Sequence, residues 1–171
     1  MTVLEKLKLQ IKIIQIQLQI LFLRQKLTVP NLPPPTKIIL HHGGGWLDFE
    51  GVNRHHKELW GFRSSLGFYV GYQYWIDRLG VISQARADNE EGAHTKGMNK
   101  LSIGVCLMGD GTKADFTIAQ YNSLFILFNR LGQKYNILKS EFYGHKNFNP
   151  TICPSDRLYD WLLKYKSGDN S

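Results

Sequence analysis

The chain has 171 residues, of which 43% are hydrophobic and 12% aromatic, so it is long enough to fold as one domain around a substantial core. This composition excludes a disordered chain, and two cysteines exclude a small disulfide-stapled framework. The net charge of +7 favours an anionic partner, such as a nucleic acid, an anionic membrane or an anionic cell wall. Four of those net charges lie in residues 1–29, and the rest of the chain is too weakly basic to indicate nucleic-acid binding.

Residues 1–29 predict an amphipathic helix, because they are rich in Leu, Ile, Gln and Lys and contain no glycine or proline. Apolar residues fill the a and d positions of three heptads: Leu4, Leu7, Ile11, Ile14, Leu18 and Leu21. A second apolar set widens this surface: Leu9, Ile13, Ile16, Ile20 and Leu23. Self-association, packing on the same chain and membrane contact all fit this pattern, and the alternation along residues 11–20 leaves a strand as an alternative.

The same segment lacks the character of a targeting sequence. Its apolar centre is interrupted by Lys12, Gln15, Gln17 and Gln19, and no small-residue cleavage site follows it. We therefore expect neither a transmembrane helix nor a signal peptide.

A proline-rich stretch separates this segment from the rest of the chain. Residues 30–36 include three consecutive prolines, which favour a stiff and extended linker. The domain organisation that we predict is a helical segment at 1–29, a linker at 30–36 and a folded domain at 37–171.

The folded domain begins with segments typical of strands. Residues 37–40 are a short apolar run that leads into two histidines, and residues 56–62 are typical of a helix end or a loop. Glycines 43–45 follow the histidines without the Lys-Ser/Thr of a phosphate loop, so we expect them to let the backbone leave the strand sharply. Three further segments read as strands, the second as the hairpin partner of the first: residues 68–77, 78–86 and 101–109.

Two helices are predicted in the second half of the domain. Thr117 and Gln120 have the spacing of a capping box, and Gly132 is expected to end the helix that they begin. Its apolar stripe comprises Ile118, Tyr121, Leu124, Phe125, Phe128 and Leu131. Residues 155–166 predict a final helix. The resulting fold class is α/β, with a mixed central sheet flanked by helices.

The stretch "GHKNFNPTICP", residues 144–154, contains the first candidates for chemistry. Cys153 fits four roles: half of a disulfide with Cys106, a nucleophile served by His145, a metal ligand, or a small buried side chain. An imidazole and a thiolate are both good zinc ligands, and His41 at a strand end can supply a third. Two histidines and one cysteine would leave the fourth position for water, as in a catalytic zinc site.

His94 and Asn99 lie in a second polar loop, "GAHTKGMN". Ordinary turn chemistry explains both residues, and a pair of hydrogen-bonding side chains on the rim of a cleft is the alternative. The residues alone do not separate these interpretations.

Four motifs occur in a recognisable order: "IILHH", "VGYQYWIDRLG", "GAHTKGMNKLSIGVCLMGDG" and "GHKNFNPTICP". Together they resemble the zinc-dependent N-acetylmuramoyl-L-alanine amidases of phage-lysin type, a family that includes the peptidoglycan recognition proteins. The resemblance covers about residues 37–165, and the N-terminal helix and linker lie outside it.

The resemblance implies a set of functional residues. The family's zinc ligands match His41, His145 and Cys153, and its active-site tyrosine and the residue two before the cysteine match Tyr72 and Thr151. Three residues are assigned to the substrate groove: His42, His94 and Asn99. Gln73 replaces the histidine that is usual after the Gly-Tyr pair, which removes no ligand.

The implied activity is zinc-dependent hydrolysis of the amide between N-acetylmuramic acid and L-alanine in peptidoglycan, by a phage or prophage endolysin. Such a protein waits in the host cytoplasm before it reaches the wall. The alternatives are a peptidoglycan-binding module without catalysis, a bacterial autolysin or recycling amidase, and a cysteine hydrolase that uses Cys153 and His145. Cys106, inside an apolar strand, is expected to be a small buried residue rather than a disulfide partner.

Overall fold

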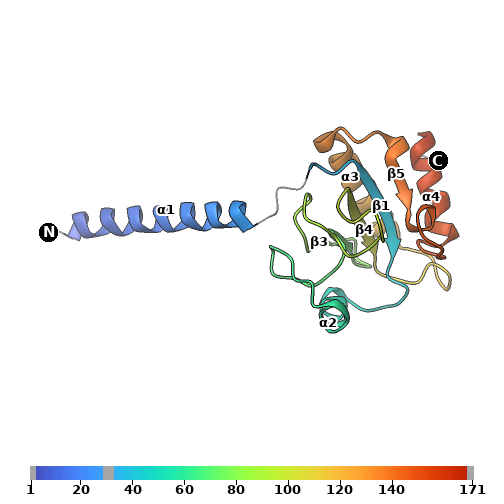
Figure 1. Cartoon of the computed structure of the whole chain (residues 1–171), viewed down its shortest axis with the longest axis horizontal. Coiled ribbons are helices and arrows are strands. Elements are labelled where there is room, and N and C mark those ends of the chain that lie inside the picture. Colours follow the sequence, from blue (N-terminus) through green and yellow to red (C-terminus); the bar gives the residue numbers. More distant parts are fainter. Residues whose placement is uncertain (1–2, 29–32, 169–171) are drawn as a thin grey trace. The chain divides into compact units, whose positions relative to one another are not determined.

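The structure is a computed structural model that describes residues 3–28 and 33–168, with the side chains of residues 5–20 and 33–168. The chain divides into two compact units, Met1–Asn31 and Leu32–Ser171 (Figure 1). Part of the predicted linker, residues 30–32, lies outside the described residues, and residues 33–36 form no regular secondary structure.

The first unit contains one helix, α1 (Val3–Thr28), so the prediction of a helix is confirmed and the strand alternative is wrong. Every described side chain of α1, over residues 5–20, is exposed. The side chains of Leu4, Leu21 and Leu23, which belong to the predicted apolar sets, lie outside the described residues. Within residues 3–28 and 33–168, no helix has both the length and the hydropathy that crossing a membrane requires.

The second unit is built on a five-stranded sheet in the order β3-β2-β4-β1-β5. β1 lies between β4 and β5 and is parallel to both, while β2 is parallel to β4 and antiparallel to β3. The predicted mixed sheet and the predicted hairpin are therefore confirmed. The strands are β1 (Lys37–His42), β2 (Tyr74–Ile76), β3 (Ile82–Gln84), β4 (Ser102–Leu107) and β5 (Phe142–Gly144).

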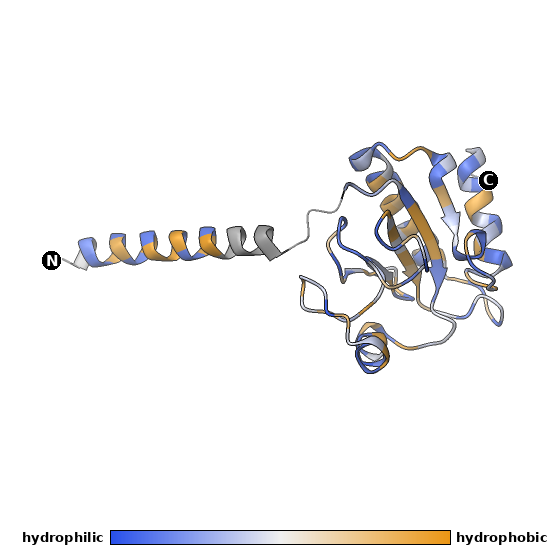
Figure 2. Cartoon of the chain, in the orientation of Figure 1, coloured by the Kyte–Doolittle hydropathy of each residue, from blue (hydrophilic) through white to orange (hydrophobic). Residues whose placement is uncertain are grey.

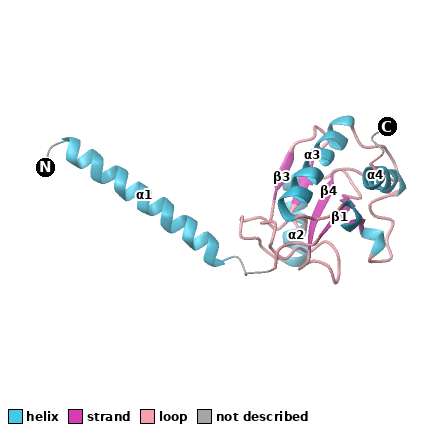
Figure 3. Cartoon of the chain, turned by 90° about the horizontal axis from the view of Figure 1, so that it is seen from above, coloured by secondary structure: helices cyan, strands magenta, loops and turns pink. Residues whose placement is uncertain are grey.

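Helices cover this sheet on both faces (Figure 3). Asp48 caps the first of these helices, α2 (Phe49–Trp60), by accepting from the backbone N–H of Gly51. Gly61 ends the same helix in the left-handed conformation. The helices are α2 (Phe49–Trp60), α3 (Ile118–Tyr135) and α4 (Asp156–Ser167), with the short 3-10 turns η1 (Lys139–Glu141) and η2 (His145–Asn147). The final helix is thus confirmed.

The capping box of α3 is present as predicted, whereas its predicted end at Gly132 is wrong. The helix continues to Tyr135 and ends at Asn136, a residue type that tolerates the left-handed conformation it adopts (φ 52°). The predicted stripe is also partly wrong, because Ile118 is 80% exposed while Leu127 is completely buried.

Side chains alternate along the strands between two hydrophobic clusters. The larger cluster packs β1, β2 and β4 against α3 and α4, and we call this side the α3 face. The smaller cluster on the opposite side, the α2 face, comprises Val52, Val70, Trp75, Ala85 and Cys106. Both cysteines are free and buried, so the disulfide interpretation is wrong and the prediction of a buried Cys106 is confirmed.

Candidate metal centre

Three predicted ligands come together at the carboxyl end of β1. Leu40 of β1 pairs with Gly144 of β5, and both strands end close to this point. The residues that follow, His41 and His145, therefore lie side by side, with their ring centroids 4.7 Å apart. Cys153 lies on the loop after η2, and one ligand atom from each of the three residues lies within 4.8 Å of the other two.

The ring nitrogens of His41 face in two directions. Nδ1 lies 3.6 Å from the Sγ atom of Cys153, inside the cluster. Nε2 lies 3.1 Å from Nδ1 of His94 and 3.3 Å from the hydroxyl of Thr95. Such a partner on the far nitrogen fixes the tautomer and ring orientation of a metal-ligating histidine.

The other two ligands are oriented in the same way. Nε2 of His145 lies 3.0 Å from Oδ1 of Asn149, an oxygen that can only accept, so Nε2 carries the proton and Nδ1 keeps a free lone pair. The backbone N–H of His42 donates to Sγ of Cys153 at 3.4 Å. Each ligand thus presents one donor atom to a common point, which is an arrangement that can hold a metal ion.

Burial keeps these ligands uncharged. It is the main cause that lowers the pKa of His41 well below its ordinary value, followed by its histidine neighbours, and it also lowers the pKa of His145. Burial raises the pKa of Cys153 to about 12, against the opposing effect of the His42 N–H and Lys146. The imidazoles are therefore ready to coordinate, and a metal ion has to displace the thiol proton.

The loop with His94 and Asn99 supports the cluster from one side. Oδ1 of Asn99 accepts from the backbone N–H groups of His94 and Thr95, at 2.9 and 2.8 Å. Space for the His94 ring exists because Gly92 and Gly104 lack side chains, since a Cβ atom at either would lie 2.4 or 2.6 Å from its Cδ2 atom. His94 is 8% exposed and contacts His41, while Asn99 borders a cavity of about 360 Å³ at this loop.

The structure places His42 and Thr151 differently from the ligands. His42 follows the parity of Leu40 and so belongs to the α3 face, where Nδ1 accepts from the backbone N–H of Gly111 at 3.1 Å. The hydroxyl of Thr151 accepts from the N–H of Cys153 at 3.1 Å and so shapes the ligand loop. The side chain of His42 is thus separate from the cluster, whereas Thr151 adjoins it.

Tyr72 lies beside the cluster, with its ring centroid 5.1 Å from that of His41. Burial of its hydroxyl raises the pKa of Tyr72 well above the ordinary value, so the phenol stays protonated and can donate a hydrogen bond at neutral pH. Gly71 before it is required by close packing, because a Cβ atom there would lie 2.3 Å from the carbonyl oxygen of Ala93.

His56 of α2 holds the backbone just before Tyr72, and sequence reasoning missed it. The N–H of Gly71 donates to Nδ1 of His56 at 3.0 Å. The His56 ring also lies 4.3 Å from the ring of Trp60 and 5.8 Å from that of Tyr72. The consecutive histidines at 55 and 56 within a helix were the available signal.

We expect His56 to make stability depend on pH. Burial, and to a smaller extent the charges of His55 and Arg86, lowers the pKa of His56 from 6.5 to about 4. Between these pH values the unfolded chain therefore binds a proton on His56 that the folded chain does not bind. The contribution of neutral His56 to the free energy of unfolding is complete above pH 6.5 and is lost as the pH falls towards 4. Urea unfolding should show wild type losing about 2 kcal/mol more than His56→Gln across this range. Equal losses would contradict the assignment.

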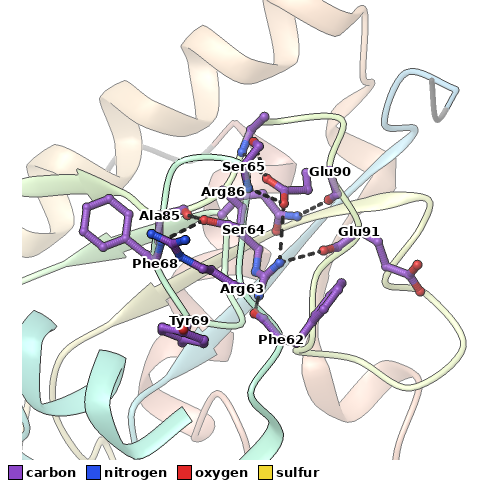
Figure 4. A network of polar contacts seen from close by, with 12 residues as sticks. Phe62, Arg63, Ser64, Ser65, Phe68, Tyr69, Ala85, Arg86, Glu90 and Glu91 are labelled. Atoms are coloured by element: carbon purple, nitrogen blue, oxygen red, sulfur yellow. Dashed lines mark hydrogen bonds and ion pairs between the residues drawn. The ribbon is translucent and has the colours of Figure 1, made fainter. Parts of the chain in front are cut away.

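A buried arginine fixes the two loops that carry Tyr72 and His94 (Figure 4). The side chain of Arg86 is completely buried, and its Nε and Nη1 groups donate to the carbonyl oxygens of Val70 and Glu91 at 2.7 and 3.2 Å. Nη2 donates to the carbonyl oxygen of Phe62, and the Glu90 carboxylate lies 3.8 Å from Nη1. Glu90 itself accepts from Ser65 and from the N–H of Ala87, so the network joins residues 62–70 to residues 86–91.

Gln73 also belongs to this support. It is completely buried, and its amide donates to the carbonyl oxygen of Glu90 at 2.7 Å while accepting from the N–H of Gly104 at 2.7 Å. The glutamine thus joins the loop before His94 to β4, which explains why this position holds a side chain that both donates and accepts.

Comparisons with known proteins agree with this geometry. The family model for N-acetylmuramoyl-L-alanine amidase matches residues 31–156. The endolysin of Enterobacteria phage T3 is 41% identical over 100 residues, which span 56% of this chain and 65%, less than two thirds, of that protein. The endolysin amidase LysCS of Clostridium intestinale URNW is 27% identical, with a TM-score of 0.69 over 79% of this chain and 84% of that one.

A more distant structure shares the fold. A Tyr-to-Phe mutant of Drosophila PGRP-LB, solved in complex with tracheal cytotoxin, is 21% identical, with a TM-score of 0.68 over 81% of this chain and 86% of that one. The family match covers most of the second unit, including every residue of the His41, His145 and Cys153 cluster. The chain therefore belongs to the N-acetylmuramoyl-L-alanine amidase family.

Proposed function

We propose that this chain hydrolyses the amide bond between N-acetylmuramic acid and L-alanine in peptidoglycan, with zinc held by His41, His145 and Cys153. The convergence of these three donor atoms within 4.8 Å, in a chain of this family, is the observation that carries the proposal. The hydrolytic unit is residues 37–171, and the setting is that of a phage or prophage endolysin, as the name of the phage T3 relative suggests.

One donor pair has the separation of a zinc site, and the three donor atoms lie within 4.8 Å of one another. Zn–S and Zn–N bonds of about 2.3 and 2.05 Å at a tetrahedral angle separate the two donors by about 3.6 Å. That is the distance between Sγ of Cys153 and Nδ1 of His41. Three protein ligands would leave one coordination position open, as in catalytic zinc sites, and a zinc ion bound there would acidify water and polarise a carbonyl group.

The neighbouring residues would handle the charge and protons of the reaction. The neutral phenol of Tyr72 donates a hydrogen bond to the oxygen of the scissile carbonyl as negative charge develops on it, and it is our candidate donor of the proton to the leaving amine. Thr151 accepts from the N–H of Cys153, which leaves its hydroxyl proton free to donate towards the same oxygen or to orient water.

Mass spectrometry of digested peptidoglycan tests the reaction. Purified sacculi incubated with the zinc-loaded chain should release stem peptides with a free N-terminal alanine, and a strong chelator should stop the release until zinc is restored. Binding to sacculi without any released peptide would instead support a non-catalytic recognition module. Release that persists after complete removal of zinc would support a cysteine hydrolase.

Tyr72→Phe tests the role of the phenol. We expect turnover to fall by about 10² to 10³, the usual cost of removing one oxyanion donor, while zinc content stays at one per chain. Tyr69→Phe is the matched control, because Tyr69 lies in the same segment and uses its backbone N–H to bind Asn53. Full turnover in Tyr72→Phe would remove Tyr72 from the mechanism.

A further inference from the structure

The surface of α1, taken by itself, is unusually apolar. Eight of its aliphatic side chains are between 42% and 61% exposed: Leu7, Leu9, Ile11, Ile13, Ile14, Ile16, Leu18 and Ile20. Figure 2 shows hydrophobic and hydrophilic bands alternating along the coloured part of the helix. Exposed apolar surface of this extent marks an interaction site.

These side chains form two stripes rather than one. With about 100° of rotation per residue, Leu7, Ile11, Ile14 and Leu18 share one side of the helix, and Leu9, Ile13, Ile16 and Ile20 share the other, about 180° away. The strips of surface between them are polar and carry no apolar residue over residues 6–19. One holds Lys8, Lys12, Gln15 and Gln19, and the other holds Lys6, Gln10 and Gln17.

Two opposed stripes fit a membrane poorly. A helix that lies on a bilayer buries one apolar side and turns a charged side to water. Whichever stripe of α1 entered the lipid, the other would face water, and no helix among the described residues is able to span a membrane. A pair of helices likewise covers one stripe of each member and leaves the second exposed.

The two stripes match each other in spacing. Successive members are four, three and four residues apart in both, and the second stripe follows the first by two residues. This is the spacing of a heptad seam, so a stripe on one copy is complementary to either stripe on another copy. Over residues 13–19 both flanks hold only glutamines, which let helices of like charge approach without repulsion.

We propose that α1 assembles with further copies of this chain into a row, in which each inner helix lies between two others and buries one stripe against each. The assembly therefore contains at least three chains. If the proposed function holds, it presents several hydrolytic units to one polymeric wall, which raises avidity without any new contact in the site. The assembly itself is independent of that function.

Light scattering coupled to size exclusion tests the proposal with the full chain. Wild type should have at least three times the 19.7 kDa mass of one chain. Replacing Ile11 and Ile14 by glutamine removes one stripe, and replacing Ile13 and Ile16 removes the other. Each double variant should stop at two chains, and the quadruple variant should be a monomer.

Two controls keep this test decisive. Gln10→Ala and Gln17→Ala change a polar flank and should preserve the wild-type mass. Flotation with vesicles of phosphatidylglycerol and phosphatidylcholine examines the lipid alternative, and we expect no binding. A wild-type mass of one or two chains, unchanged masses in all stripe variants, or vesicle binding by a monomer would each overturn the proposal.

Discussion

Replacing Cys153 by alanine is expected to abolish zinc retention and peptidoglycan hydrolysis together. The variant lacks the thiolate donor. The two remaining imidazoles supply only two of the three protein ligands. Loss of a residue that merely supports a ligand costs about 10- to 100-fold in metal affinity, so loss of the ligand itself should cost at least ~100-fold. The measurements are zinc per chain by elemental mass spectrometry after dialysis, and release of stem peptides.

Cys106→Ala is the matched control for this experiment. Cys106 is the other free cysteine and is completely buried on the α2 face, so both substitutions remove a buried thiol. We expect Cys106→Ala to keep one zinc per chain. Full zinc content in Cys153→Ala would contradict the proposed ligand set. Inactivity of Cys153→Ala combined with chelator-resistant wild-type hydrolysis would instead identify Cys153 as a nucleophile.

Arg86→Leu should destabilise the second unit by about 3–5 kcal/mol, the usual cost of removing one partner of a buried ionic network. Leucine removes every donor from a completely buried position, so the carbonyl oxygens of Phe62, Val70 and Glu91 lose their hydrogen bonds. The Glu90 carboxylate also loses its nearby positive charge. Urea unfolding followed by tryptophan fluorescence measures this loss.

Arg63→Leu provides the comparison, because Arg63 lies in the same network on the exposed side and donates to the carbonyl oxygen of Gly67 at 3.2 Å. An exposed contact of this kind is worth less than about 1 kcal/mol. If the two variants unfold at the same urea concentration, the buried network contributes little. If Arg86→Lys is as stable as wild type, the positive charge alone accounts for the stabilisation. The hydrogen bonds to three carbonyl oxygens then contribute nothing measurable.

Helices and strands with a long hydrophobic pattern could be predicted from the sequence. β1, β4, α3 and α4 have apolar sequences that the chain displays directly, and they were predicted. β5 was not predicted, because three residues, Phe142–Gly144, carry no pattern of their own and become a strand only by pairing with β1. That pairing is what sets His145 beside His41, so local sequence alone does not reveal the cluster.

The residues that support the cluster were not predicted either. Asn149 and Thr95 contact ligand side chains four and fifty-four positions away, and only the fold brings the second pair together. Gly132 predicts a helix end because glycine is frequent at that position. It stays inside α3, where its carbonyl oxygen accepts from the backbone N–H of Ile137 at 2.9 Å, and the left-handed cap falls on Asn136 four residues later.

The two glycines under His94 bear on how this sequence tolerates change. Gly92 and Gly104 are not among the three predicted ligands, yet any side chain at either position would occupy the volume of the imidazole that abuts His41. Most positions in a β-strand accept an exchange of one small residue for another, and Gly104 in β4 does not, since even the methyl group of alanine is too large. The candidate metal centre therefore also restricts which residues are tolerated at positions that contribute no functional group to it.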